Sequence, residues 1–490
     1  MRLVVSPPAP VPVPGVSVPG VPVPVDPPRR GQLLQILGVG FGLAVAIGNT
    51  IGAGILRTPG VIAAQLPNAW LFMLVWVVGG LYALLGAIAV AELGTMLPQS
   101  GGQYVFTRHA LGDYAGFIVG WSDWLSTCGT VAAVAIVVGE YSSALFPAMM
   151  RWTSATFGGL ASSMPFAEFQ TNAIAVFIAL FFGLLQWRGL RWGSGTQNIT
   201  SLAKTIALFA LVGACFLLGG KHQDVAIPAT AATLPSAMAF FFAMVFSLQA
   251  VIYTYDGWTG VVYFSEEVRN PGRDVPRALF GSILLIMVIY LLLNLALLYL
   301  LPISRIAGDE FPAGTASNLI FGRYGDTVIR SIMIISMLSC VNACHMMATR
   351  VMFAMGRDRL FTERAATVNR GGTPTVALAA SVFVAVLFIV LGKQFGKVIE
   401  ALAFFFVANY TLTFTSVFVL RRTEPDAPRP YRSWGHPWTT GLALLGSIAF
   451  LFGAIWGDLH DHKFSSLYAL GLLVASYPVY RISKYLSARP

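Results

Sequence analysis

Long apolar segments separated by short polar connections make up most of the chain. The segments recur from Leu33 onwards, and each has the roughly 20 residues that an α-helix needs to cross the hydrocarbon core of a bilayer. We therefore predict an all-α polytopic membrane protein with twelve transmembrane helices. The predicted spans cover residues 34–59, 70–97, 114–146, 171–186, 195–218, 237–268, 278–301, 327–355, 376–391, 398–420, 438–456 and 467–485.

Two of these spans are interrupted by glycine. The first contains the sequence Gly-Ala-Gly at 52–54, and the sixth contains Asp256 and Gly257. Glycine weakens a helix, and non-helical backbone inside a membrane is tolerated only where protein buries it or a water-filled cavity meets it. The two spans stand five apart and so cross in opposite directions. Interrupted helices at matching positions of two halves are typical of an inverted repeat with a transport site near the middle of the membrane.

The spacing of the breaks predicts the domain organisation. Spans one to five form one repeat, about 33–219, and spans six to ten form the other, about 237–421. Two accessory helices, about 438–485, complete a single transmembrane domain of residues 31–490. Residues 1–30 are a Val-Pro and Gly-Pro tract, which we expect to be a disordered cytoplasmic tail because proline at this density prevents helix formation.

Composition and charge support a membrane protein. The chain is 56% hydrophobic and 11% charged, whereas soluble domains have about 25% charged residues. The net charge of +10 does not indicate a nucleic-acid partner, because the basic residues concentrate in alternate short connections, which is the positive-inside pattern. This pattern places both termini on the cytoplasmic side of the cell inner membrane, as an even number of spans requires.

The break in the first span offers groups of both polarities. Unwinding after Ile51 frees the amides of residues 52–54 at the positive end of a half-helix, where a carboxylate binds well. The carbonyls of Thr50 and Ile51 end the other half-helix and would face a positive group. An α-amino acid carries both charges on one carbon. The alternative is that the glycines only allow close helix packing.

The break in the sixth span holds a carboxylate at membrane depth, which is costly and indicates a function. Asp256 either caps the second half of this span or contacts the ammonium group of a ligand. Tyr253 and Trp258 are candidates to close over a ligand, although aromatic residues in an apolar span often only pack.

Two other spans carry buried polar groups. Lys204 lies deep in the fifth span, where it could neutralise carbonyls at the first break or carry a proton; the alternative is a side chain that extends to the end of the span. The eighth span has a polar face that includes Asn342 and His345. We expect no metal site, because Cys340, Cys344 and His345 lack a fourth ligand and cysteine is common in apolar cores.

The connection at 265–277 is dense in charges of both signs. It is either a solvated connector or an inner gate whose ion pairs break when the protein opens inward.

The chain resembles the amino acid–polyamine–organocation superfamily, and within it the bacterial relatives of the L-type amino acid transporters. Four motifs carry the resemblance, and they follow one another in order across spans one to nine. They lie within residues 51–60, 98–121, 255–271 and 350–374.

The resemblance implies the leucine-transporter-type 5+5 inverted repeat. It also implies that the substrate carboxylate lies on the amides of Ala53 and Gly54, and that the α-amino group meets carbonyls of residues 50, 253 and 256, with Tyr253 as a lid. Lys204 matches a lysine that takes the place of sodium in sodium-coupled relatives. Asn342 falls where family members contact the substrate side.

These inferences predict a sodium-independent secondary transporter of amino acids that works by alternating access, either as an exchanger or with protons, and not an enzyme. No cofactor is expected; the partners are the substrate and the lipid bilayer. A neutral substrate is favoured if Asp256 is a cap, and a cationic amino acid or polyamine if it is free; a non-transporting sensor is a further alternative. The predicted substrate-binding and coupling residues are Thr50, Ile51, Gly52, Ala53, Gly54, Tyr253, Asp256, Gly257, Trp258, Asn342 and Lys204.

Overall fold

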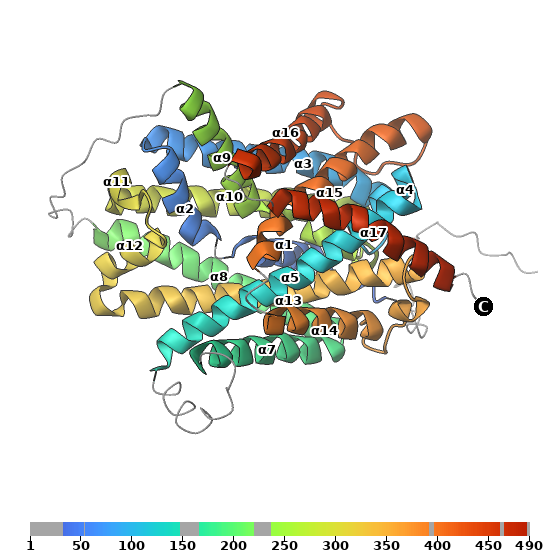
Figure 1. Ribbon diagram of the computed structural model, residues 1–490, viewed down its shortest axis with the longest axis horizontal. Helices are drawn as coiled ribbons and strands as arrows, with labels where there is room; N and C mark the ends of the chain where they lie inside the picture. The colour runs from blue at the N-terminus through green and yellow to red at the C-terminus, as the bar shows by residue number, and fades with distance from the viewer. Residues whose placement is uncertain are drawn as a thin grey trace, which may run out of the picture.

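The computed structural model describes residues 33–52, 54–147, 166–219, 237–391, 396–460 and 465–487. Within these ranges every regular element is a helix, and pairing of extended backbone is limited to two isolated bridges (Figure 1). The proline-rich segment 1–30 and Ala53 lie outside the described residues. An all-helical membrane architecture is therefore confirmed for the described part of the chain.

The helices follow the predicted spans closely. Among the described residues, nine helices or runs of helices are long and apolar enough to cross a membrane. If the bent pair of helices at the first span is counted as one further span, the number is ten. The count of twelve stays a prediction. The main helices are α1 (Val39–Thr50), α2 (Gly54–Gln65), α3 (Ala69–Met96), α5 (Asp113–Leu145), α7 (Phe166–Trp187), α8 (Leu190–Leu218), α9 (Ala237–Tyr255), α10 (Pro271–Leu300), α13 (Gly325–Arg357), α14 (Thr375–Leu391), α15 (Gly396–Thr423), α16 (Trp438–His460) and α17 (Ser465–Ser487).

Several short helices lie in segments that we predicted to be connections. They are α4 (Gln103–Leu111), α11 (Ile303–Ile306), α12 (Pro312–Phe321) and the 3₁₀ helices η4 (Gly322–Tyr324) and η5 (Glu363–Ala366). Each has ten residues or fewer, well below the length of a span. A search for long apolar runs therefore does not detect them.

Both predicted helix breaks are present. In the first span, α1 ends at Thr50 and α2 starts at Gly54, with an angle of 48° between them. In the sixth, α9 ends at Tyr255 and the 3₁₀ helix η3 (Trp258–Glu267) follows. Gly257 between them has φ +106°, and a Cβ there would lie 2.7 Å from Asn49 Nδ2. Only glycine suits both this backbone conformation and this close approach of the two breaks.

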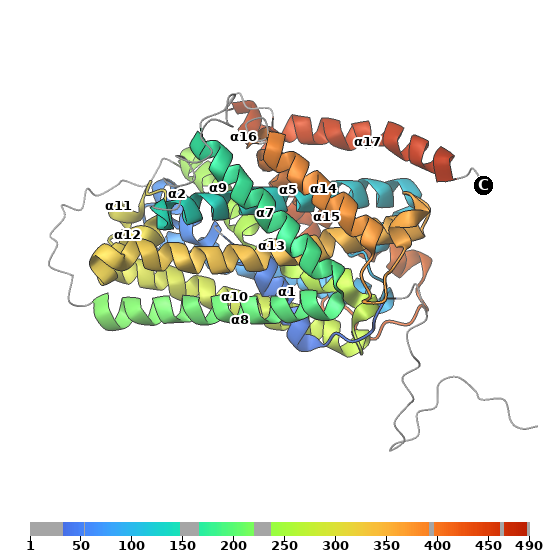
Figure 2. The ribbon, with the colours of Figure 1, turned by 90° about the horizontal axis from the view of Figure 1, so that it is seen from below.

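The interrupted helices occupy the centre of the helix bundle. Helix α1 packs against α8, α10, α13 and η3, and η3 also contacts α3 and α10. Helices α5 and α13 cross beside them, whereas α7 and α14 pack together on the side of α5 (Figure 2). Backbone that leaves the helical conformation is thus surrounded by protein, as the membrane environment requires.

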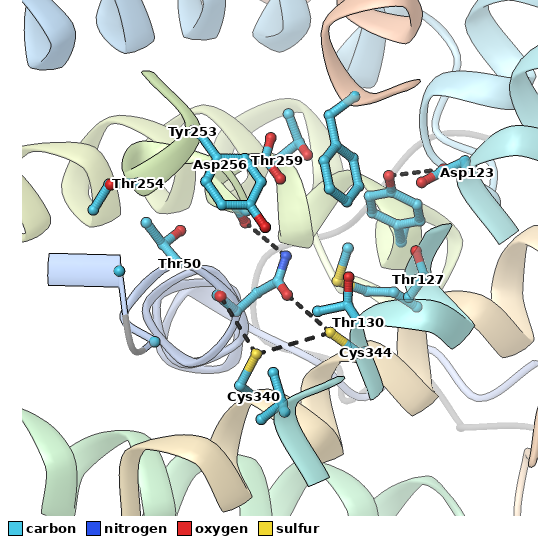
Figure 3. Close-up of a pocket in the computed structure, with 18 of the residues that line it drawn as sticks. Thr50, Asp123, Thr127, Thr130, Tyr253, Thr254, Asp256, Thr259, Cys340 and Cys344 are labelled. Atoms are coloured by element: carbon cyan, nitrogen blue, oxygen red, sulfur yellow. Dashed lines mark hydrogen bonds between the residues drawn. The ribbon is translucent and has the colours of Figure 1, made fainter. Parts of the chain in front are cut away.

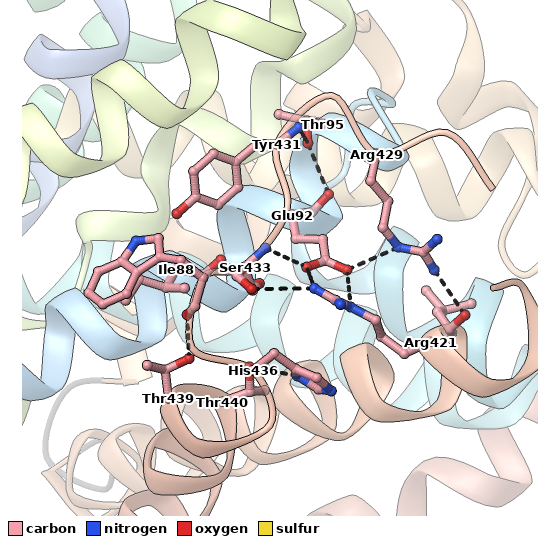
Figure 4. A network of polar contacts seen from close by, with 12 residues as sticks. Ile88, Glu92, Thr95, Arg421, Arg429, Tyr431, Ser433, His436, Thr439 and Thr440 are labelled. Atoms are coloured by element: carbon pink, nitrogen blue, oxygen red, sulfur yellow. Dashed lines mark hydrogen bonds and ion pairs between the residues drawn. The ribbon is translucent and has the colours of Figure 1, made fainter. Parts of the chain in front are cut away.

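A buried carboxylate joins α3 to α15 and to the segment that follows α15 (Figure 4). Glu92 is 1% exposed and accepts hydrogen bonds from Arg421 Nε (2.8 Å), Arg429 Nε (3.0 Å) and the backbone amide of Ser433 (2.7 Å). Two guanidinium groups and an amide therefore share one carboxylate. Such a group is satisfied only while all its partners are in place.

We expect Glu92→Gln to destabilise the protein, because the arginines would lose the charge that they share. Removing one partner of a buried ion pair costs about 3 kcal/mol or more. Thermal unfolding in detergent, monitored by size-exclusion chromatography, should give a lower Tm for the variant than for the unmodified protein. Glu363→Gln is the control, because the pair of Glu363 with Arg359 is mostly exposed. Equal Tm values for the two variants would contradict this assignment.

Candidate functional site

The two helix breaks open onto one cavity of about 220 Å³ (Figure 3). This is below the roughly 300–1,000 Å³ of pockets for drug-sized ligands, and it suits a smaller molecule. The lining residues come from eight helices and from the breaks themselves. They are Asn49, Thr50, Gly52, Gly54, Gln103, Asp123, Thr127, Thr130, Val134, Tyr253, Thr254, Asp256, Gly257, Thr259, Tyr263, Cys340, Cys344, Met347, Phe406 and Tyr410.

The first break presents polar groups to this cavity. The hydroxyl of Thr50 is buried and has no hydrogen-bond partner within the described part of the chain. A Cβ added at Gly52 would meet no atom within 4 Å, so the backbone there borders open space. Gly54 begins α2, whose first amides have no partner in the helix. A buried polar group without a protein partner usually binds water or a ligand.

The carbonyl groups of the first break are largely used within the protein. The oxygen of Ile51 accepts hydrogen bonds from Lys204 Nζ (2.8 Å) and Ser336 Oγ (2.7 Å). The oxygen of Thr50 accepts one from the Tyr290 hydroxyl (3.1 Å). A carbonyl oxygen has two lone pairs, so Thr50 retains acceptor capacity and Ile51 has none left. Ile51 also does not line the cavity.

Lys204 lies behind the first break and is fully buried on α8. Its ammonium group donates hydrogen bonds to the carbonyls of Gly48 (2.9 Å) and Ile51 (2.8 Å). These carbonyls belong to the last turn and the C-cap of α1, where the helix dipole is negative. The geometry agrees with the first of the two roles considered, in which Lys204 neutralises carbonyls at the break; proton transfer by Lys204 stays a prediction.

The second break contributes Tyr253, Asp256 and Gly257 to the lining. Asp256 accepts a hydrogen bond from the hydroxyl of Tyr410 on α15, a partner that the sequence did not indicate. Tyr253 is 43% exposed, so solvent reaches its ring. Trp258 does not line the cavity; it is buried and stacks on Tyr410, with ring centroids 5.5 Å apart. It therefore supports the wall from behind.

Asn49 links the two breaks to α13. Its amide nitrogen is 3.5 Å from the carbonyl oxygen of Gly257, and its amide oxygen accepts a hydrogen bond from the thiol of Cys344 (3.1 Å). The thiol of Cys340 lies 3.6 Å from the backbone oxygen of Asn49. Both cysteines are buried, as is common for cysteine in an apolar core, and they also form part of the cavity wall. Their spacing of four residues, which puts them on one face of a helix, was the available signal.

The predicted polar face of the eighth span is divided between two roles. Ser336 reaches the first break, as described above. Asn342 does not line the cavity; its amide donates hydrogen bonds to Gln197 Oε1 (2.8 Å) and to the carbonyl of Gly193 (3.0 Å). It thereby connects α13 to α8. We conclude that Asn342 supports the site from a distance and does not border it.

Asp123 on α5 is a charged lining residue that the sequence interpretation missed. It is 2% exposed and accepts a hydrogen bond from the hydroxyl of Tyr263 on η3 (2.8 Å). A signal was present, because any carboxylate in the middle of a predicted span is a candidate functional group.

Ion pairs connect the end of η3 to α13. Glu267 and Arg350 form two hydrogen bonds of 2.9 and 3.0 Å and are almost fully buried. Glu266 pairs with Arg357 at 2.9 Å, and Asp358 pairs with Arg108 at 3.1 Å. A solvated connector does not describe the buried Glu267, whereas the inner gate stays a prediction.

Comparison with known proteins gives consistent matches over most of the chain. A family model described as an amino acid permease matches residues 41–476. The serine/threonine exchanger SteT of Bacillus subtilis is 28% identical over 454 residues, which are 91% of this chain and 96% of the exchanger. The b(0,+)-type amino acid transporter 1 of Mus musculus is 25% identical, covering 82% of this chain and 80% of its own length. The large neutral amino acids transporter small subunit 2 of Oryctolagus cuniculus is also 25% identical, covering 94% and 82%.

The cavity predicts which thiols react with small reagents. Cys340 and Cys344 line it, whereas Cys128 and Cys215 are buried elsewhere. A methanethiosulfonate reagent should therefore modify Cys340 or Cys344 first, because only these thiols border space that the reagent can enter. Peptide mass spectrometry of the purified protein measures the sites. Modification of Cys128 or Cys215 at the same rate would show that the cavity does not control access.

Proposed function

The chain belongs to the amino acid permease family, and from this premise we propose that it is a sodium-independent secondary transporter of amino acids that works by alternating access. The observation that carries the proposal is the meeting of two broken helices at one small cavity. Its relatives transport amino acids and are not enzymes. The chemistry of the cavity is that of a binding site for a small zwitterion.

The substrate carboxylate binds the amides of residues 52–54 in this proposal. Gly52 borders open space, and the N-terminus of α2 at Gly54 supplies free donors and a partial positive charge. Ala53 stands between these two glycines in the sequence, and its amide is the third donor of the proposal. The absence of side chains at both glycines lets a ligand approach the backbone closely.

The α-amino group lies on the other side of the same site. We place it at the remaining lone pair of the Thr50 carbonyl, with the carbonyls of Tyr253 and Asp256 as further acceptors. The hydroxyl of Thr50, which is buried without a partner, is a further contact. Gly257 keeps the two breaks close together, and Tyr253 closes over the ligand from the exposed side.

Sodium independence follows from Lys204. A cation that would bind the carbonyls at the end of α1 competes with an ammonium group that already donates to two of them. The lysine therefore supplies permanently the positive charge at these carbonyls that a sodium ion would supply only when bound. Transport is then driven by exchange or by protons.

Alternating access needs contacts that form in one state and break in the other. We propose that the pair of Glu267 and Arg350 is an inner gate, together with the pair of Glu266 and Arg357. The twelve-span arrangement with two inverted repeats, 33–219 and 237–421, and with both termini in the cytoplasm, is part of the same proposal. The protein then lies in the cell inner membrane.

The preference for a neutral substrate rested on finding no free carboxylate once Asp256 is assigned as a cap. Asp123 now supplies a second carboxylate in the cavity, so that ground no longer holds. A sensor that binds without transporting would use the same site, and only a flux measurement separates the two.

The carboxylate site is tested with Gly52→Val. The added side chain enters open space and should fill it, so amino acid uptake into proteoliposomes should fall by about tenfold or more while folding is kept. Gly213→Val is the control, because Gly213 on α8 also has no atom within 4 Å of an added Cβ and does not line the cavity. Unchanged uptake by Gly52→Val would refute the site. Absence of counterflow for every amino acid in the unmodified protein would refute transport.

Lys204→Met tests the role of the lysine. We expect transport to be lost, because the carbonyl of Gly48 would lose its donor and that of Ile51 would keep only Ser336 in a dry environment. Uptake should be measured with and without sodium, beside the chromatographic profile of the variant. The exposed Lys484, changed to Met, is the control. Transport by Lys204→Met at the unmodified rate in sodium-free buffer would contradict the proposal.

A further inference from the structure

The cavity has an imbalance of charge that an amino acid backbone does not correct. Two carboxylates, Asp123 and Asp256, line it, and none of the described lining residues is Lys, Arg or His. The α-carboxylate and α-amino groups of a substrate cancel each other. A buried carboxylate needs a positive partner or strong hydrogen bonds to remain charged. The ligand itself is therefore a source of the missing positive charge.

Asp123 is the carboxylate with the clearer need for a cation. It is almost fully buried, and its partner Tyr263 is a neutral hydrogen-bond donor, so no described lining residue supplies a positive charge to balance an ionised carboxylate there. The hydroxyls of Tyr263 and Thr127 leave part of the acceptor capacity of the carboxylate open, because an ionised carboxylate has about four lone-pair sites.

The position of Asp123 suits a side chain and not the substrate backbone. It lies on α5, whereas the groups proposed for the backbone lie at the breaks beside α1 and α9. Figure 3 shows Asp123 on the far side of the cavity from Thr50 and Thr254. Thr127 and Thr130 follow it at helical spacing and also line the cavity. One polar face of α5 thus runs along the space that a side chain would fill.

We propose that Asp123, with the hydroxyl of Tyr263, is a subsite for the side-chain ammonium or guanidinium group of a cationic amino acid. The inference rests on the proposed function and names its substrate class. Asp256 differs, because it lies at the break itself and is held by Tyr410. The carboxylate of Asp123 thus recognises the distal charge of the substrate, and the breaks recognise its α-carbon.

The test compares ligands that differ in charge and little in shape. Arginine and citrulline form one pair of ligands, and lysine and norleucine form the other. Each should be tested as a competitor of labelled arginine for binding to the purified full-length protein. A hydrogen-bonded charge pair contributes about 1.5–3 kcal/mol, which is about tenfold or more in affinity. We expect arginine and lysine to be preferred by at least this factor over citrulline and norleucine.

Asp123→Asn then assigns the preference to its residue. We expect the variant to lose the preference for arginine while it binds citrulline as before. Tyr263→Phe should reduce the preference in part, which gives a second variant if Asp123→Asn does not fold. Asp326→Asn is the control, because Asp326 is exposed and pairs with Arg330 at 2.7 Å outside the cavity; it should keep the full preference.

Each other outcome overturns the inference in a distinguishable way. Strong binding of citrulline and norleucine without preference for the charged partner would leave the proposed function standing and remove the subsite. A preference that survives Asp123→Asn would assign the cation to Asp256. Loss of proton-coupled uptake of neutral amino acids in Asp123→Asn would make Asp123 a proton site. Absence of binding for all four ligands and for every other amino acid would instead refute the proposed function.

Discussion

Backbone groups that leave a helix inside a membrane must find partners, and this constraint determines the centre of the structure. The break between α1 and α2 frees carbonyls on one side and amides on the other. Lys204 and Ser336 take up the carbonyl of Ile51, and Tyr290 takes one lone pair of Thr50. The amides at the start of α2 and the hydroxyl of Thr50 are without such partners in the described part of the chain. The protein thus satisfies the carbonyl side of the break, and in the proposed function the substrate satisfies the amide side.

The same cost of burying charge separates carboxylates that join helices from carboxylates that face the cavity. Glu92 is held by two arginines, and Glu267 is held by Arg350. The partners of Glu92 and Glu267 are arginines on other helices or, for Arg429, on the segment that follows α15, and they satisfy each buried charge while these elements stay together. Asp123 and Asp256 face the cavity and have tyrosine hydroxyls as partners. A carboxylate held by a neutral donor can still take a cation, and on this ground we propose that the cavity, and not the ion pairs, recognises the substrate.

The sequence predicted what depends on local chemistry. Apolar length located the main helices, and glycine together with Asp256 located both breaks. Contacts between helices were harder to predict from the sequence, because they depend on how the helices are oriented and on which way each side chain points. The backbone carbonyl of Ile51 is bound by Lys204, Trp258 stacks on Tyr410, and Asn342 joins α8, although all three residues were expected at the ligand. Tyr410 carries no signal in an apolar span, because aromatic residues are common there. Asp123 did carry a signal, because it is a carboxylate inside the predicted third span.

A density map of the full-length protein in lipid nanodiscs with a bound amino acid tests the central claim most directly. The account predicts ligand density between the two breaks, with the carboxylate at the amides of residues 52–54 and the α-amino group toward Thr50 and Asp256. Density for the amino acid elsewhere in the protein, with the cavity between the breaks filled only by water, would contradict it.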